Sequence, residues 1–93
     1  MALALSAVTD TTRSSAIAMT GPKTFIISQG SFSGEGRIKA EIQVSGSSFP
    51  PIELPPHMIR VERDRFFTLD LYGVDLFLSV VAPNGSPVSI EYT

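Results

Sequence analysis

The chain has no cysteine and no tryptophan, and only 17% of its 93 residues carry a charge. Without cysteine, neither a disulfide framework nor a thiolate metal site can stabilise the fold. The charged fraction lies below the roughly 25% of typical soluble domains, whereas the apolar fraction is 43%. A domain this small has little interior. The composition therefore favours apolar surface that is covered by another chain, with an ordinary small β-domain as the alternative.

A basic excess is also lacking, since the formal net charge is −2. Nucleic-acid binders usually carry the opposite charge, so we expect no nucleic-acid partner. No apolar run approaches the roughly 18 residues of a membrane span, so we expect no membrane partner. Residues 1–8 have neither the basic start nor the apolar length of a secretion signal.

No catalytic constellation is visible either. His57 is the only histidine, and no nucleophile with an orienting partner can be assigned to it. Asp70 and Asp75 flank a predicted hairpin turn at residues 71–74, and they supply too few oxygen ligands for calcium. The glycine-rich stretch 30–36 lacks the lysine and helix of a phosphate-binding loop. The sequence predicts a protein that is not an enzyme, with no catalytic, cofactor-binding or metal-ligating residue and no small-molecule substrate.

What the sequence does contain is the alternation of an all-β domain. Apolar side chains from Ile38 to Val44 alternate with charged or amide side chains, which is typical of an antiparallel strand with one buried face. A polar turn at residues 45–48 and a strand over 52–54 complete a predicted hairpin. Asn84-Gly85 predicts a second hairpin, around residues 83–87. Turn residues recur about every 8–12 positions, which favours a single small antiparallel β-sandwich of about seven or eight short strands.

The predicted strands are residues 15–20, 24–29, 37–45, 52–54, 58–61, 66–71, 75–81 and 88–92. The predicted core residues are Ile38, Ala40, Ile42, Val44, Leu69, Leu71, Leu76, Leu78, Val88 and Ile90. The sandwich domain is expected over residues 14–93.

Residues 1–13 form the first candidate contact segment. Only the first eight could be helical, and so short a helix would be marginal alone. Leu3, Leu5 and Val8 form an apolar set that a free tail in water has no reason to carry. Alone, the segment buries too little to offset its ordering cost. We therefore predict an N-terminal arm that orders only against another subunit, with a frayed terminus as the alternative.

The second candidate is the segment that ends in Phe66. Arg60, Arg63 and Arg65 precede it, and arginine forms bidentate bonds to carboxylates and is enriched in interfaces. Phe66 and Phe67 must face opposite sides of a strand, so one of them is available as a contact anchor. A solvated turn is the alternative. The predicted partner-contact residues are Leu3, Leu5, Val8, Arg60, Arg63, Arg65 and Phe66.

The order of these features resembles the small β-sandwich virion proteins of tailed bacteriophages. The resemblance covers residues 20–93 and rests on Gly30-Ser31-Phe32-Ser33-Gly34, the strand 38–44, the polar turn 45–48 before Phe49, and the strands within 51–54 and 71–92. It implies a non-enzymatic capsid decoration (cement) protein that stabilises contacts between major capsid subunits, or else a head–tail or tail component. It also implies a homotrimer on the capsid surface of a virion, made in the host cytoplasm, whose partners are the major capsid protein and sister protomers.

A carbohydrate- or receptor-binding β-sandwich module is the alternative from another class. Sugars stack on aromatic faces, and the chain has no tryptophan and only two tyrosines. This composition favours the structural protein.

Overall fold

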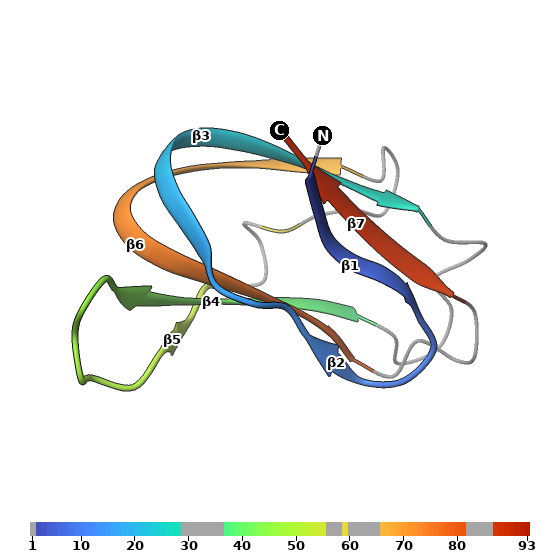
Figure 1. Cartoon of the computed structure of the whole chain (residues 1–93), viewed down its shortest axis with the longest axis horizontal. Coiled ribbons are helices and arrows are strands. Elements are labelled where there is room, and N and C mark those ends of the chain that lie inside the picture. The colour runs from blue at the N-terminus through green and yellow to red at the C-terminus, as the bar shows by residue number, and fades with distance from the viewer. Residues whose placement is uncertain (1, 29–36, 56–58, 60–65, 82–86) are drawn as a thin grey trace.

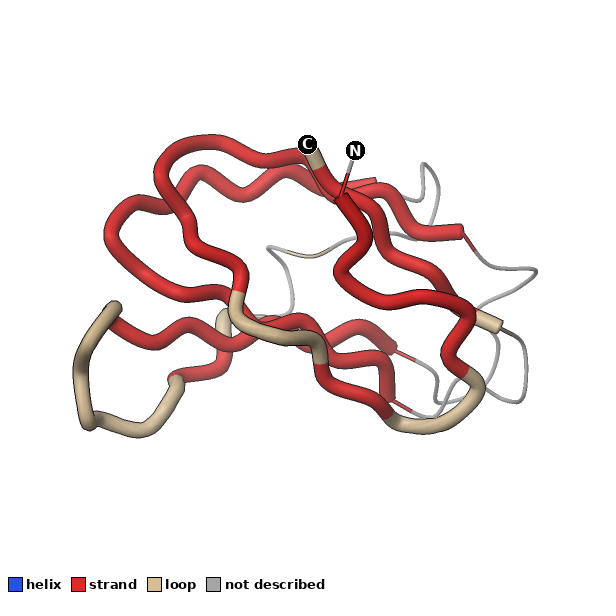
Figure 2. The backbone as a smooth tube through the Cα atoms, viewed as in Figure 1, coloured by secondary structure: helices blue, strands red, loops and turns tan. Residues whose placement is uncertain are grey.

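The computed structural model describes residues 2–28, 37–55, 59, 66–81 and 87–93. Its regular elements are all strands (Figures 1 and 2). They form one antiparallel sheet in the order β1-β7-β3-β6-β4-β5, and β2 pairs with β6 beside this path. The predicted all-β class and antiparallel pairing are confirmed. The strands are β1 (Ala2–Val8), β2 (Thr12–Arg13), β3 (Ile17–Ser28), β4 (Arg37–Val44), β5 (Ile52–Glu53), β6 (Phe66–Val81) and β7 (Val88–Tyr92).

The two long strands, β3 and β6, fold this sheet over on itself. They pair along residues 17–26 and 66–76 and bend together, as the left side of Figure 1 shows. The second half of β3 pairs with β7, and the second half of β6 pairs with β4. One layer therefore contains β1, β7, the second half of β3 and the first half of β6. The other contains β2, β4, β5, the first half of β3 and the second half of β6.

The bend of β6 coincides with one extra residue. Met19 of β3 pairs with Val74, whereas the next residue, Thr20, pairs with Tyr72. Gly73 thus has no counterpart on β3. Its φ of +70° lies in the left-handed region, which glycine adopts without the steric cost of a Cβ. This arrangement is a β-bulge, which bends a strand and increases its local twist.

The bulge also changes which side chains of β6 face the core. Before Gly73 the buried hydrophobic residues are Phe67 and Leu69, at odd positions, and after it they are Leu76, Leu78 and Val80, at even positions. Side chains of a regular strand alternate with a period of two, so one inserted residue reverses the pattern. A single strand can therefore contribute core residues to both layers.

The strand breaks predicted at Gly73 and at Gly21-Pro22 are wrong, because β6 and β3 run through them. Pro22 has no N–H to donate to a neighbouring strand. The hydrogen bond of the Thr24 carbonyl shows toward which strand the nitrogen of Pro22 points. That carbonyl accepts a hydrogen bond from the N–H of Thr93, on the β7 side of β3. Two residues earlier, the nitrogen of Pro22 points to the same side. There it lies outside the paired range 25–28, so no ladder bond is lost.

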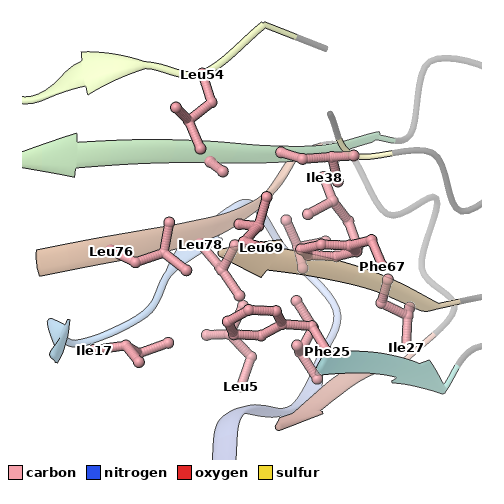
Figure 3. Packing of buried hydrophobic residues seen from close by; sticks show 14 of the residues in the cluster. Leu5, Ile17, Phe25, Ile27, Ile38, Leu54, Phe67, Leu69, Leu76 and Leu78 are labelled. Carbon is pink, nitrogen blue, oxygen red and sulfur yellow. The ribbon is translucent and has the colours of Figure 1, made fainter. Parts of the chain in front are cut away.

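An apolar core fills the space between the layers (Figure 3). Phe25 lies fully buried in it, and its ring stacks on that of Phe67 with centroids 5.1 Å apart. The ring of Tyr92 lies 5.6 Å from that of Phe25 on the other side. These three rings occupy one register row across β6, β3 and β7. The core therefore ties the two long strands to the C-terminal one.

Most of the predicted core is confirmed. Ile42 and Leu71 lie at the rim and pack against the buried cluster. The predicted burial of Val44 is wrong, since this side chain is 62% exposed. Val44 is the last residue of β4, and this end of the strand extends beyond the opposite layer. The predicted residues that are buried are Ile38, Ala40, Leu69, Leu76, Leu78, Val88 and Ile90.

The prediction of an N-terminal arm that orders only against another subunit is also wrong. The segment Ala2–Val8 forms strand β1, not a helix, and it pairs antiparallel with β7 of its own chain. Leu5 is only 7% exposed and joins the core cluster. Thr12–Arg13 pairs with β6. The edge of β7 supplies backbone partners and the core accepts Leu5, and this burial offsets the ordering cost within one chain.

The two predicted hairpins differ in outcome. The first is confirmed, because β4 and β5 pair through Ile42 with Ile52, and the N–H of Leu54 donates to the carbonyl of Ala40. The second is wrong, because β7 pairs with β1 and β3 in the part of the chain that the structure describes. The predicted turn of this second hairpin lies outside the described residues, except for Pro87. The predicted strand 58–61 also lies outside them, except for Ile59, which is buried.

Candidate functional site

One register row crosses four strands on the outer face of the layer that contains β1. Leu3 opposes Glu91, Glu91 opposes Ile26, and Ile26 opposes Phe66. We call these four residues the outer row. The neighbouring residues Phe25 and Phe67 face the core, so the outer row faces solvent by the period of two.

The outer row is an apolar strip with one carboxylate. Exposed fractions are 58% for Leu3, 37% for Ile26 and 48% for Phe66. Neighbouring strands lie about 4.8 Å apart, so the row is about 14 Å long. Ile26 and Phe66 are directly opposite each other and form an aromatic–aliphatic pair of the kind that stabilises sheets. The half-exposed Glu91 provides the single charge, which a cationic group of a partner would neutralise.

A polar row borders this strip. The hydroxyl groups of Thr24 and Thr68 lie 3.0 Å apart and are hydrogen-bonded to each other. These two residues also oppose each other on β3 and β6. An apolar centre with a polar border is the usual anatomy of a protein contact surface.

Two of the predicted contact residues, Leu3 and Phe66, thus lie at the two ends of the outer row although they are far apart in sequence. Leu5 faces the core of its own chain, and Val8 is half-buried and packs against that core. The predicted contacts Arg60, Arg63 and Arg65 lie outside the described residues. Sequence reasoning missed Ile26 in the run Phe25-Ile26-Ile27. Three apolar residues in succession force the middle one to the other face, so this signal was present.

A second apolar surface lies at the end of β4 and β5. Ile52 opposes Ile42, and Val44 opposes Val74. We call these four residues the β4–β5 patch. They lie on the face that is buried farther along β4, at Ala40. Ile52 and Val44 are mostly exposed, so this part of the core face extends out from under the opposite layer.

The turn between β4 and β5 projects at the lower left of Figure 1 and is braced by its own hydrogen bonds. The side-chain amide of Gln43 donates to the carbonyl of Phe49 at 2.7 Å. The N–H of Phe49 donates to the Ser47 hydroxyl at 3.0 Å, and the N–H of Ser47 donates to the carbonyl of Val44 at 2.9 Å. Gly46 takes φ +77°, a turn conformation that suits glycine. The bracing presents the patch in one conformation, which lowers the entropic cost of binding.

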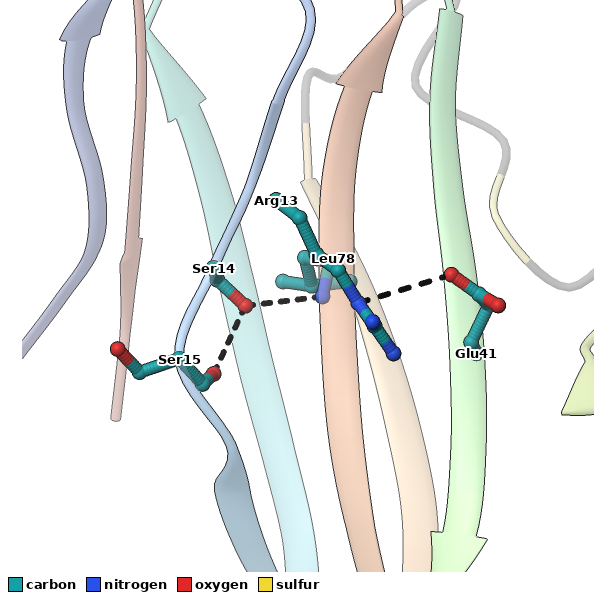
Figure 4. A network of polar contacts seen from close by, with 5 residues as sticks. All are labelled: Arg13, Ser14, Ser15, Glu41 and Leu78. Atoms are coloured by element: carbon teal, nitrogen blue, oxygen red, sulfur yellow. Dashed lines mark hydrogen bonds and ion pairs between the residues drawn. The ribbon is translucent and has the colours of Figure 1, made fainter. Parts of the chain in front are cut away.

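The outer face of the layer that contains β2 and β4 is polar, and its polar groups contact other groups of the same chain (Figure 4). The Arg13 guanidinium lies 4.2 Å from the centre of the Phe77 ring, and its Nε is 3.8 Å from Oε1 of Glu41. The buried hydroxyl of Ser14 accepts from the N–H of Leu78 and donates to the carbonyl of Ser15. These contacts fasten the β2 segment to β6 and β4, and all of them have their partners within the chain.

The two carboxylates expected at a hairpin turn lie instead along one strand. Asp70 opposes Pro22 before the bulge of β6, and Asp75 opposes Ala18 after it. Oδ1 of Asp75 accepts a hydrogen bond from the Ser45 hydroxyl at 3.3 Å. Among the described residues, no group of three or more histidine, cysteine, aspartate or glutamate side chains is placed to hold a metal ion. His57 lies outside them.

The described part of the chain contains no helix of the length and apolarity needed to cross a membrane. No family model, curated protein or solved structure matches this chain. The chain is therefore a small all-β protein with a folded-over antiparallel sheet and two separate exposed apolar surfaces.

Proposed function

We propose that the protein is a non-enzymatic structural component of a virus particle, a capsid decoration protein that binds across neighbouring subunits of the shell. The observation that carries the proposal is the presence of two apolar surfaces, the outer row and the β4–β5 patch, on one domain of 93 residues. A protein that bridges two subunits needs two contact surfaces. The virion setting comes from the resemblance of residues 20–93 to small phage virion proteins.

The size of these surfaces favours binding in many copies. Full burial of one aliphatic or aromatic side chain contributes about 1.5–3 kcal/mol, and the exposed parts of the outer row amount to roughly one and a half such side chains. The exposed parts of Val44 and Ile52 in the β4–β5 patch amount to slightly less. Together they provide about 4–8 kcal/mol, whereas association costs about 4–15 kcal/mol. A single copy would bind weakly, so the proposal includes the homotrimer, because linked copies gain about 10²–10⁴ in avidity.

The positions of the aromatic residues weigh against a carbohydrate-binding module. Phe66 lies in the outer row, Phe49 in the β4–β5 turn and Tyr72 beside the bulge of β6. Sugar sites instead combine neighbouring aromatic faces with convergent polar groups. Phe66 and Tyr72 lie six residues apart on β6, about 20 Å along an extended strand, so their rings are not neighbours, and Phe49 lies on another segment.

Co-sedimentation tests the proposal. Particles are purified on a density gradient from cells in which the gene has been deleted, and recombinant protein is added before centrifugation. We expect the wild-type protein in the pellet. The double variant Ile26→Ser/Phe66→Ser should bind at least about tenfold more weakly, because it loses most of the apolar area of the outer row.

The control is Tyr72→Ser, which removes an exposed ring from β6 outside the outer row. It should bind as the wild type does, and circular dichroism should show the same fold for all three proteins. Wild-type protein that stays in the supernatant at every concentration would exclude a decoration function. Equal binding by the double variant would exclude the outer row as the contact surface.

A further inference from the structure

Strand β1 is held to its own chain by an irregular edge contact. In the part of the chain that the structure describes, β7 is the only strand that pairs with β1. The pairing shifts register twice, between Leu3 and Leu5 and between Leu5 and Val8. Ala7 adopts φ +46°, a left-handed conformation that is unfavourable for a residue with a Cβ. The N–H of Ala7 donates to the Ser89 hydroxyl, a side-chain acceptor, at 2.8 Å.

The connection that follows β1 is short for the distance it covers in the fold. Val8 opposes Val88 in one layer, whereas Thr12 opposes Val80 in the other. Only residues 9–11 separate the two strands. The hydroxyl of Thr12 donates to the carbonyl of Asp10, so the connection includes a tight local turn. Short hinge segments under strain favour the exchange of an element between copies of a chain.

The sequence of β1 does not oppose pairing with another molecule. Ala2–Val8 contains neither a charged residue nor proline, the two features that most often protect an edge strand. Its anchor is Leu5, which inserts into the core cluster that also holds Phe25 (Figure 3). The acceptor for this strand consists of the edge of β7 and the site that Leu5 fills. Every copy of the chain has this acceptor.

We propose that β1 is exchanged between copies of this protein, so that β1 of one copy pairs with β7 of a second copy. The exchange preserves the contacts of Ala2–Leu5, because the acceptor is identical in both molecules. It also allows residues 7–11 to extend, which relieves the left-handed conformation at Ala7. Extended, residues 8–12 reach up to about 17 Å, enough to cross to a copy that lies alongside. This inference does not depend on the proposed function, and it requires no particle.

Disulfide trapping tests the exchange directly, because the native chain has no cysteine. Leu3 and Glu91 oppose each other on β1 and β7, and opposed residues of antiparallel strands have Cα atoms within the range that a disulfide spans. The variant Leu3→Cys/Glu91→Cys is refolded at high and at low concentration, oxidised and run on a non-reducing gel. We expect covalent oligomers after refolding at high concentration and intrachain-linked monomers after refolding at low concentration.

The matched control is Leu3→Cys/Thr20→Cys. Thr20 pairs with β6 and not with β1, so this variant should form no specific cross-link in either state. A Leu3→Cys/Glu91→Cys protein that gives only intrachain disulfides at every concentration would overturn the proposal. So would equal cross-linking of the two variants, because it would indicate random collision.

A second variant tests the strain. Ala7→Gly removes the Cβ from the left-handed residue and should stabilise the unexchanged monomer. Removing the strain of one left-handed residue shifts the equilibrium between monomer and exchanged oligomer about fivefold or more per copy. We therefore expect the oligomeric fraction of Ala7→Gly to be about fivefold lower than that of the wild type at the same concentration, as measured by light scattering after size exclusion. An unchanged fraction would contradict the role of Ala7. Neither experiment measures particle binding, so failure here is distinguishable from failure of the proposed function.

Discussion

Gly73→Pro should unfold the protein, because proline fixes φ at about −65° whereas the bulge of β6 has φ +70° at this residue. Without the bulge and with the length of β6 unchanged, the alternation of Phe67 and Leu69 would continue and would turn Leu76, Leu78 and Val80 to the outside. These last three side chains are fully buried. Exposing them costs about 5–9 kcal/mol at about 1.5–3 kcal/mol each. A domain of 93 residues has a total stability of only about 5–14 kcal/mol.

Far-UV circular dichroism with urea unfolding measures this effect, and a milder substitution at the same residue accompanies it. A Cβ at residue 73 would meet no atom within 4 Å, so Gly73→Ala adds only the cost of φ +70°. That cost is about 1–2 kcal/mol, which lowers the melting temperature by about 5–15 °C. Ser48→Ala, at an exposed turn residue, is the control and should change stability little. A Gly73→Pro protein that unfolds cooperatively within about 1 kcal/mol of the wild type would show that the bulge does not set the orientation of β6.

Three further substitutions test the packing and polar contacts through urea unfolding. Leu78→Ala should lower the free energy of unfolding by about 2–5 kcal/mol, because Leu78 is fully buried, whereas the same truncation at the exposed Val44 should change it by less than about 1 kcal/mol. Equal losses at the two sites would contradict the assignment of Val44 to the surface. Ser14→Ala should cost about 1–3 kcal/mol, since it leaves the buried N–H of Leu78 without its hydroxyl acceptor, and a neutral result would mean that another acceptor replaces it. Glu41→Gln should cost less than about 1 kcal/mol, because its ion pair with Arg13 is partly exposed, and a larger loss would show a buried role for that carboxylate.

Local patterns predicted the faces of several strands correctly. The alternation from Ile38 to Ile42 places these residues toward the core, and Phe66 and Phe67 point to opposite sides as a period of two requires. The β4–β5 hairpin was also predictable, because the polar turn that joins its strands is a local signal. Each of these features depends on residues that are close together in sequence.

The remaining parts of the fold depend on contacts between distant residues. Gly73 and Gly21-Pro22 are compatible with a turn, but glycine also permits a bulge and proline is accepted at an unpaired strand edge. Their place within β3 and β6 follows only when the partners of those strands are known. Similarly, the segment Ala2–Val8 is too short to order alone, and its structure depends on the edge of β7.

The candidate site was predictable to a similar extent. Leu3 and Phe66 were expected as contacts, but their placement in one row follows from the pairing of β1, β7, β3 and β6. The alternation of β4 predicted the orientation of Val44 correctly and its burial wrongly. A sequence pattern specifies which face a side chain occupies. Whether another layer covers that face depends on how far the layer extends.

Decoration of a virus shell by this protein can be seen directly by cryo-electron microscopy of particles purified from cells that carry the gene. Reconstructions from the wild type and from the gene deletion are compared. We expect a density of the size of a 10.0 kDa domain on the outer surface of the wild-type shell, in contact with more than one capsid subunit and missing from the deletion. Two shells with identical outer surfaces would contradict it, as would a difference confined to the particle interior.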